Sequence, residues 1–212
     1  MRKRRWASRD RGRPGHPALA RALMPVVVAL LAALFVAGCG LQTEQANKEL
    51  AQGTKHQEEA EAVLARFKSF SSDWQTIFQT SGITQAQIDK ARALIAAREK
   101  DLEALDLALK NWAADLTLIR KLDVDDKIKE YVDLKLRAIR LWQDYSSMYL
   151  SPLVKAYGGM VETIAYGRPA SEQTAKAQEI TGLVTESVQK LEECRSAEKQ
   201  AEDYFTENKL GK

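Results

Sequence analysis

A series of residues at alternating steps of three and four restricts the fold of this chain more than any other feature. Such spacing puts its members on one face of an α-helix that packs lengthwise against other helices. A half-buried strand would instead alternate every second residue, and from Gln42 onward no segment does. We therefore predict an all-α protein. The series is apolar except at Arg98 and comprises Ile88, Ala91, Ile95, Arg98, Leu102, Leu105, Leu109, Trp112, Leu116 and Ile119.

Local signals place the start of this helix at Thr84. Thr84 is a preferred N-cap residue, and Gln87 three positions later completes a capping box. Ile83 and Ile88 flank the cap with the spacing of a hydrophobic staple. The helix is predicted to end near Lys121, and the acids of residues 123–126 suit the cap and first turn of the next helix.

Three more long helices are predicted from similar patterns. The first spans about Thr43 to Gln79, and the third extends from the acids at 123–126 to Tyr166. Within the third helix, Ser151-Pro152 predicts a kink or restart with Ser151 as the cap. A turn at residues 167–171 separates it from a final helix that continues toward the C-terminus.

The connections between these helices are short, which favours antiparallel neighbours. We expect an elongated antiparallel four-helix bundle with up-down-up-down topology and coiled-coil-like heptad seams. At a rise of 1.5 Å per residue its helices would be about 55 Å long.

The N-terminus carries a different pattern. Eight Lys and Arg residues and one Asp precede the uncharged stretch of residues 22–41, whose strongly apolar part ends at Val36-Ala37-Gly38-Cys39. Two small residues followed by a cysteine resemble the lipobox of bacterial lipoprotein precursors. The resemblance implies that residues 1–38 are a signal peptide removed between Gly38 and Cys39, and that Cys39 carries the acyl chains, palmitate among them. The alternative is an uncleaved transmembrane helix, because 20 uncharged residues can span a bilayer.

Removal of residues 1–38 changes the charge balance of the chain. Eight of its 32 basic residues and one of its 29 acidic residues lie in that segment, so 24 basic and 28 acidic residues remain, a net charge near −4. This balance argues against nucleic-acid binding. We assign residues 39–56, which are polar, to a tether or frayed helix start and residues 57–212 to the bundle domain.

Chemical motifs are scarce in the predicted bundle. A di-iron site in a helical bundle needs Glu-x-x-His pairs, and the chain has none. Its two histidines are His16 in the leader and His56 in the predicted tether, where we expect a solvated side chain. We therefore predict no metal, no cofactor and no enzymatic activity.

Three other features leave two interpretations each. Cys194 is either a reactive thiol, including an intermolecular disulfide partner, or a small core residue. Arg98 either binds an anionic ligand or pairs with an acid and extends toward water. The acids at 123–126 and 192–193 either bind a divalent cation or serve as caps and solvated side chains.

Aromatic residues are most concentrated between residues 142 and 160. A kinked helix with Trp142, Tyr145, Tyr149 and Tyr157 could form a candidate binding surface for a sugar or peptide. The same residues are also spaced as core packing requires.

The overall plan resembles the cell-wall-binding helical lipoproteins of bacteria. This resemblance implies a membrane-anchored, non-enzymatic envelope lipoprotein that acts as a spacer or docking module for an envelope protein or a cell-wall polymer. Its domain would lie on the extracytoplasmic side of the cell membrane or, since Gly40 is not Asp, of the outer membrane. The alternatives are a ligand-binding or sensor subunit and an accessory chain of an envelope enzyme.

Overall fold

A computed structural model describes residues 41–79 and 82–210, so the predicted signal peptide and Cys39 lie outside the described residues. Within those ranges the chain is all-helical and contains no β-strand, which confirms the predicted fold class. Its elements are α2 (Leu41–Ile77), α3 (Gln85–Ile119), α4 (Asp126–Tyr145), the π-helical segment η1 (Ser146–Leu150), α5 (Ser151–Ala165) and α6 (Ala170–Glu207). Because α4, η1 and α5 follow one another without a break, they make one long helix beside α2, α3 and α6.

The start of α3 lies where its capping signals predict. The Thr84 side chain accepts a hydrogen bond from the backbone N–H of Gln87, and the Gln87 side chain accepts one from the Thr84 backbone. Nine of the ten residues in the predicted series are buried, Leu102 being half-buried. Ile83 remains 54 % exposed, so the staple expected with Ile88 leaves most of its surface in water.

The N-terminus of α4 is capped as predicted. The Asp125 carboxylate accepts a hydrogen bond from the Lys127 backbone N–H at 2.7 Å.

The region around Pro152 differs from the prediction. Ser151 is not a cap, because its own backbone is helical and its N–H donates to the carbonyl of Ser146. Proline lacks the N–H of a regular turn and crowds the carbonyl four residues earlier. The wider turn of η1 accommodates both effects without ending the helix.

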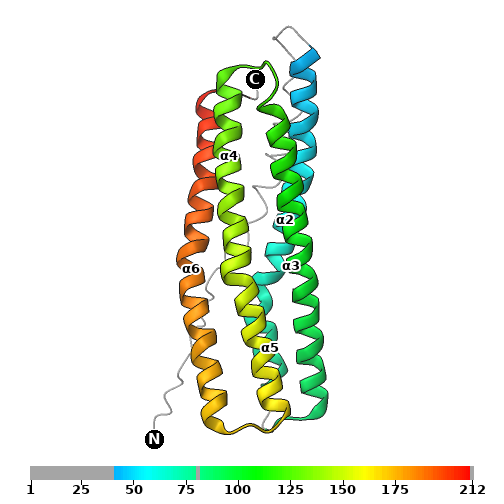
Figure 1. Cartoon of the computed structure of the whole chain (residues 1–212). Helices are drawn as coiled ribbons and strands as arrows, with labels where there is room; N and C mark the ends of the chain where they lie inside the picture. The colour runs from blue at the N-terminus through cyan, green and yellow to red at the C-terminus, as the bar shows by residue number, and fades with distance from the viewer. Residues whose placement is uncertain (1–40, 80–81, 211–212) are drawn as a thin grey trace, which may run out of the picture. The chain divides into compact units, whose positions relative to one another are not determined.

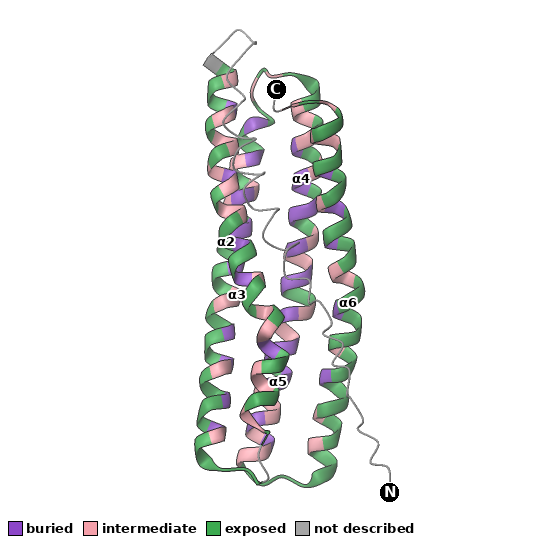
Figure 2. Ribbon diagram, turned by 180° about the vertical axis from the view of Figure 1, so that it is seen from behind, coloured by how far each residue is buried: buried purple, intermediate pink, exposed green. Residues whose placement is uncertain are grey.

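Neighbouring helices lie side by side along their length (Figure 1). Helix α2 packs against α3, α3 also contacts α4 and α5, and both of these pack against α6. Figure 2 shows that buried residues line the sides of the helices that face one another, while exposed residues cover the outer sides.

The core consists of two apolar clusters stacked along the bundle. One surrounds Trp112, Trp142 and Cys194, and the other surrounds Phe70 and Tyr157. Phe67 and Leu102 pack against both clusters, so the two cores adjoin at this level.

The segment assigned to a tether is helical in the structure from residue 41. Ala46 is buried in the first core cluster. A Cβ atom built on Gly53 would lie 3.1 Å from Cδ1 of Trp112. Gly53 therefore allows α2 to approach α3 closely, which is a packing role for a residue that the sequence suggested as part of a flexible stalk.

Candidate functional site

The aromatic candidates are mostly core residues. Trp142, Tyr145 and Tyr157 are 6 %, 7 % and 5 % exposed, and Tyr149 is half-buried. The Trp142 and Tyr145 rings meet edge to face, and Tyr145 stacks on Tyr149 with centroids 6.2 Å apart. Their burial supports the core interpretation over a binding surface, because a sugar or peptide stacks on exposed ring faces.

Tyr157 lies in the other cluster and contacts different rings. Its centroid is 4.7 Å from those of both Phe70 and Trp74 on α2. The four candidates are therefore divided between the two cores, with Trp142, Tyr145 and Tyr149 in one and Tyr157 in the other. The structure does not bring all four to one site.

Arg98 occupies the boundary between the two cores and is 8 % exposed. Its guanidinium forms a short hydrogen-bonded ion pair with Asp101 and lies 3.6 Å from the Asp73 carboxylate. It also lies over the rings of Phe67 and Phe70, about 6 Å from each centroid. Pairing with acids is one of the two roles expected for Arg98, but the head group is buried rather than extended into water.

Sequence reasoning missed a second interior charge, at Lys135. This residue of α4 is 4 % exposed, and its ammonium lies over the rings of Trp112 and Tyr131 at 5.7 and 6.0 Å. Burial raises the pKa of the half-buried Glu198 carboxyl on α6, and the charge of Lys135 offsets part of this rise. A signal for Lys135 was present, since it interrupts the apolar positions of α4 as Arg98 interrupts those of α3.

The single cysteine of the described residues is buried in the first core cluster. Burial raises the pKa of the Cys194 thiol to about 12, so the nucleophilic thiolate is rare at neutral pH. This environment supports the small-core-residue interpretation over a reactive thiol.

His56 is less solvated than the sequence suggested. Its ring contacts Glu59 on the same helix at 3.0 Å and lies 3.6 Å from the Asp115 carboxylate on α3. Among residues 41–79 and 82–210, no group of three or more His, Cys, Asp or Glu side chains is arranged to bind a metal ion.

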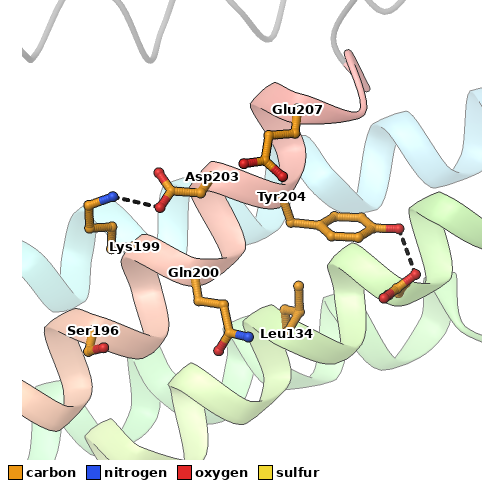
Figure 3. A pocket seen from close by; sticks show the side chains of 8 residues that line it. Leu134, Ser196, Lys199, Gln200, Asp203, Tyr204 and Glu207 are labelled. Atoms are coloured by element: carbon orange, nitrogen blue, oxygen red, sulfur yellow. Dashed lines mark hydrogen bonds and ion pairs between the residues drawn. The ribbon is translucent and has the colours of Figure 1, made fainter.

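An open groove of about 520 Å³ lies between α4 and α6. Figure 3 shows its lining side chains, with a hydrogen bond of 2.7 Å from the Tyr204 hydroxyl to Glu130 and an ion pair of 2.5 Å between Lys199 and Asp203. The hydrogen bond to Glu130 raises the pKa of Tyr204 to about 12. Three of the eight lining residues are acidic and one is basic. The lining residues are Glu130, Leu134, Ser196, Lys199, Gln200, Asp203, Tyr204 and Glu207.

The groove is lined mainly by polar and charged side chains. Its acids are already bonded to Tyr204 and Lys199, except Glu207.

None of the helices in the described part of the chain is long and apolar enough to cross a bilayer. Comparison of the chain with protein-family models, curated proteins and solved structures finds no match.

Proposed function

We propose that this chain is a non-enzymatic lipoprotein of the cell envelope, anchored through acyl chains on Cys39. The observation that carries the proposal is the lipobox-like Val36-Ala37-Gly38-Cys39 at the end of a positively charged, apolar leader. Two acyl chains hold a protein on a membrane where a single chain does not, so diacylglyceryl transfer to Cys39 would make the anchor stable. The domain would stand on the extracytoplasmic side of the cell membrane or outer membrane.

The proposed role of the domain is that of a spacer and docking module for an envelope protein or a cell-wall polymer. The proposal includes an antiparallel up-down-up-down arrangement whose helices pack through heptad seams. Helix α2 begins two residues after Cys39 and has 37 residues, so it would extend about 55 Å from the membrane. The uninterrupted helix α2 supports a spacer function, because a stiff helix sets the distance between the membrane and the far end of the domain, whereas a flexible linker does not.

Metabolic labelling with a palmitate analogue in the native host tests the anchor. The wild-type chain should carry the label, and Cys39→Ser should lose all of it and accumulate as an uncleaved precursor. Cys194→Ser is the matched control, because this buried thiol is outside the lipobox and its replacement should leave labelling intact. Equal labelling of wild type and Cys39→Ser would refute acylation at Cys39.

A ligand-binding or sensor subunit is the second candidate. It is favoured by Lys135, whose buried ammonium lies over two aromatic rings and carries a charge that a bound anion would neutralise. A small anion bound between the helices would raise the melting temperature by mass action. A screen of metabolites by thermal shift should find such a ligand if the sensor function is correct, and Lys135→Met should remove the shift.

A further inference from the structure

The two core clusters meet at a level of the bundle where few side chains join them. Phe67 and Leu102 pack against both clusters, and both are half-buried. Among the described residues, no buried side chain belongs to both clusters. The two halves of the core are therefore joined by partly exposed side chains.

Buried polar residues lie close to this level. Arg98 interrupts the apolar series of α3 here, and its Nε atom is buried without a hydrogen-bond partner. Ser187 of α6 is also buried, between Leu183, which packs against the second cluster, and Leu191, which packs against the first. A polar residue at such a position buries less apolar surface than a leucine would, which weakens the coupling between the two halves.

The backbone of the long helix formed by α4, η1 and α5 changes at the same level. Leu150 belongs to the first cluster and Leu153 to the second, so the end of η1 and Pro152 lie between the two. A π-helical turn departs from the regular hydrogen-bond pattern, and proline has no N–H to donate. This part of the helix is therefore restrained less by its own hydrogen bonds than a regular α-helix is.

Helix α6 also has a less restrained segment there. Gly159 of α5 packs against Lys176 of α6, since a Cβ atom built on the glycine would lie 3.4 Å from the lysine Cε. Because the short turn after Ala165 reverses the chain, similar distances from this contact lead back to Pro152 on α5 and on to Gly182 on α6. A Cβ atom on Gly182 would meet nothing within 4 Å, so packing does not require a glycine, which leaves the helix backbone more freedom than another residue would.

The two halves differ in the size of their cores. Among the described residues, the first cluster contains sixteen buried residues and the second contains ten. Hydrophobic stabilisation rises with the apolar area removed from water, so the half around the second cluster should be the less stable one. We call it the second-cluster half, residues 68–79, 82–101 and 151–183, and the other described residues form the first-cluster half.

We propose that the second-cluster half opens as a separate cooperative unit while the first-cluster half stays folded. Proteins open in contiguous units whose opening free energies lie below that of global unfolding. The boundary of this unit follows the partly exposed Phe67 and Leu102, the buried charge of Arg98, and the less restrained backbone at Pro152 and Gly182.

This opening bears on docking if the chain is anchored through Cys39, which rests on the proposed function. Helix α2 begins two residues after Cys39 and reaches Phe70 only near its other end, so the second-cluster half would be the one farther from the membrane. Opening would expose Phe70, Trp74 and Tyr157 to a partner there. The first-cluster half would remain folded beside the membrane.

Hydrogen exchange of the full-length protein, purified in detergent and followed by mass spectrometry, tests the separate opening. At urea concentrations below the unfolding midpoint, amides of residues 88–95 and 153–161 should exchange at least tenfold faster than those of residues 105–116 and 132–142. All four segments lie inside helices and carry buried residues of the two clusters, so fraying of helix ends does not account for a difference. Equal exchange in the two halves, or slower exchange in the second-cluster half, would overturn the proposal.

Two matched variants distinguish a separate unit from a uniform difference in packing. Val132→Ala and Val161→Ala each shorten a valine that is 0 % or 1 % exposed, in the first and second cluster respectively. Val132→Ala should speed exchange severalfold in the first-cluster half and leave the second-cluster half unchanged, because Val132 stays packed when the second-cluster half opens. Val161→Ala should speed exchange in both halves, because its contacts are lost in the partial opening and in global unfolding alike.

The response to Val132→Ala decides between the two kinds of opening. Equal acceleration in both halves would mean that the bundle opens as one unit and would overturn the proposal. Exchange is measured on the purified chain and does not depend on acylation, so failure here leaves the anchor at Cys39 to be judged by its own labelling experiment.

Discussion

At the scale of single residues, the interior of this protein contains more charge than its apolar pattern suggests. Arg98, Lys135 and Glu198 all enter helix faces that otherwise pack apolar side chains. The sequence identified Arg98 because its apolar series is long and regular. It did not identify Lys135, because aromatic rings rather than an adjacent acid accommodate that ammonium, and such rings lie on other turns and helices.

Arg98→Leu should destabilise the fold by about 3 kcal/mol, the lower end for loss of one partner of a buried ion pair, because Asp101 loses its buried partner. Asp101 would keep only its exposed partner Arg66, which it contacts at 2.7 Å. Urea denaturation measures the loss. Arg98→Leu/Asp101→Leu removes both charges and should recover at least half of it, and a double variant less stable than the single one would contradict this account.

Glu198 gives the stability a defined pH dependence. Burial raises its pKa above the ordinary value of 4.5, so the folded state holds this proton more tightly than the unfolded state. The favourable contribution is then fully present below pH 4.5 and is lost as the pH rises through the folded pKa. Glu198→Gln resembles the protonated form and should melt at a higher temperature than wild type at pH 7.

The gain of Glu198→Gln should shrink as the pH falls toward 4.5, measured by thermal unfolding across a pH series. Glu186→Gln removes an exposed acid of the same helix and serves as the control for net charge. A gain that is independent of pH, or one that Glu186→Gln reproduces, would show that the burial of Glu198 is not its source.

Cys194 should be almost unreactive in the folded protein, since it is fully buried and its thiol pKa is about 12. We expect a thiol reagent such as 5,5'-dithiobis(2-nitrobenzoate) to modify it only at the rate of unfolding, and quickly in denaturant. Rapid modification without denaturant would indicate that the first core cluster opens readily.

At the scale of the elements, the helix starts that depend on residues close together in the chain could be predicted from the sequence. The start of α3 follows from Thr84 and Gln87, which contact each other, and the α4 cap follows from Asp125. The π-helical turn before Pro152 was not predictable in the same way. Such a turn is rare and depends on how the flanking helices pack, so the expectation that Ser151 caps a restarted helix was wrong, although α5 begins at Ser151.

Gly53 shows the same dependence on packing. Nothing in the sequence around Gly53 indicates that Trp112, far along the chain, lies against it, and a polar helix with a glycine is typical of a tether.

The burial of the aromatic candidates also depends on packing between helices. Their spacing fitted both a core and a groove, and the packing of the surrounding helices buries Trp142, Tyr145 and Tyr157.

The two helical glycines Gly53 and Gly182 form a matched pair for testing this packing. Gly182→Ala should stabilise the protein by about 0.5–1 kcal/mol, because its Cβ would meet nothing within 4 Å and alanine favours the helix. Gly53→Ala should gain less or lose stability, since its Cβ would lie 3.1 Å from buried Trp112. Equal gains in denaturant melts would contradict the close approach of α2 to α3.

At the scale of the whole molecule, the described residues form an all-helical domain, and the membrane anchor at Cys39 is our proposal. The all-α class was predictable because the periodicity of the chain is helical throughout. The function of the domain was less predictable, because the residues of a packed core determine stability and do not identify a binding partner. Leu107 and Leu118 are exposed apolar residues on the outside of α3, which a sequence pattern alone does not separate from core positions.

The intact mass of the protein, purified gently from membranes of its own host, tests the central claim most directly. Acylation at the lipobox predicts a chain that begins at Cys39 and carries the mass of the attached acyl groups, while a parallel Cys39→Ser sample keeps its leader and lacks that mass. An unmodified wild-type chain that retains residues 1–38 would contradict the claim and indicate a transmembrane anchor instead.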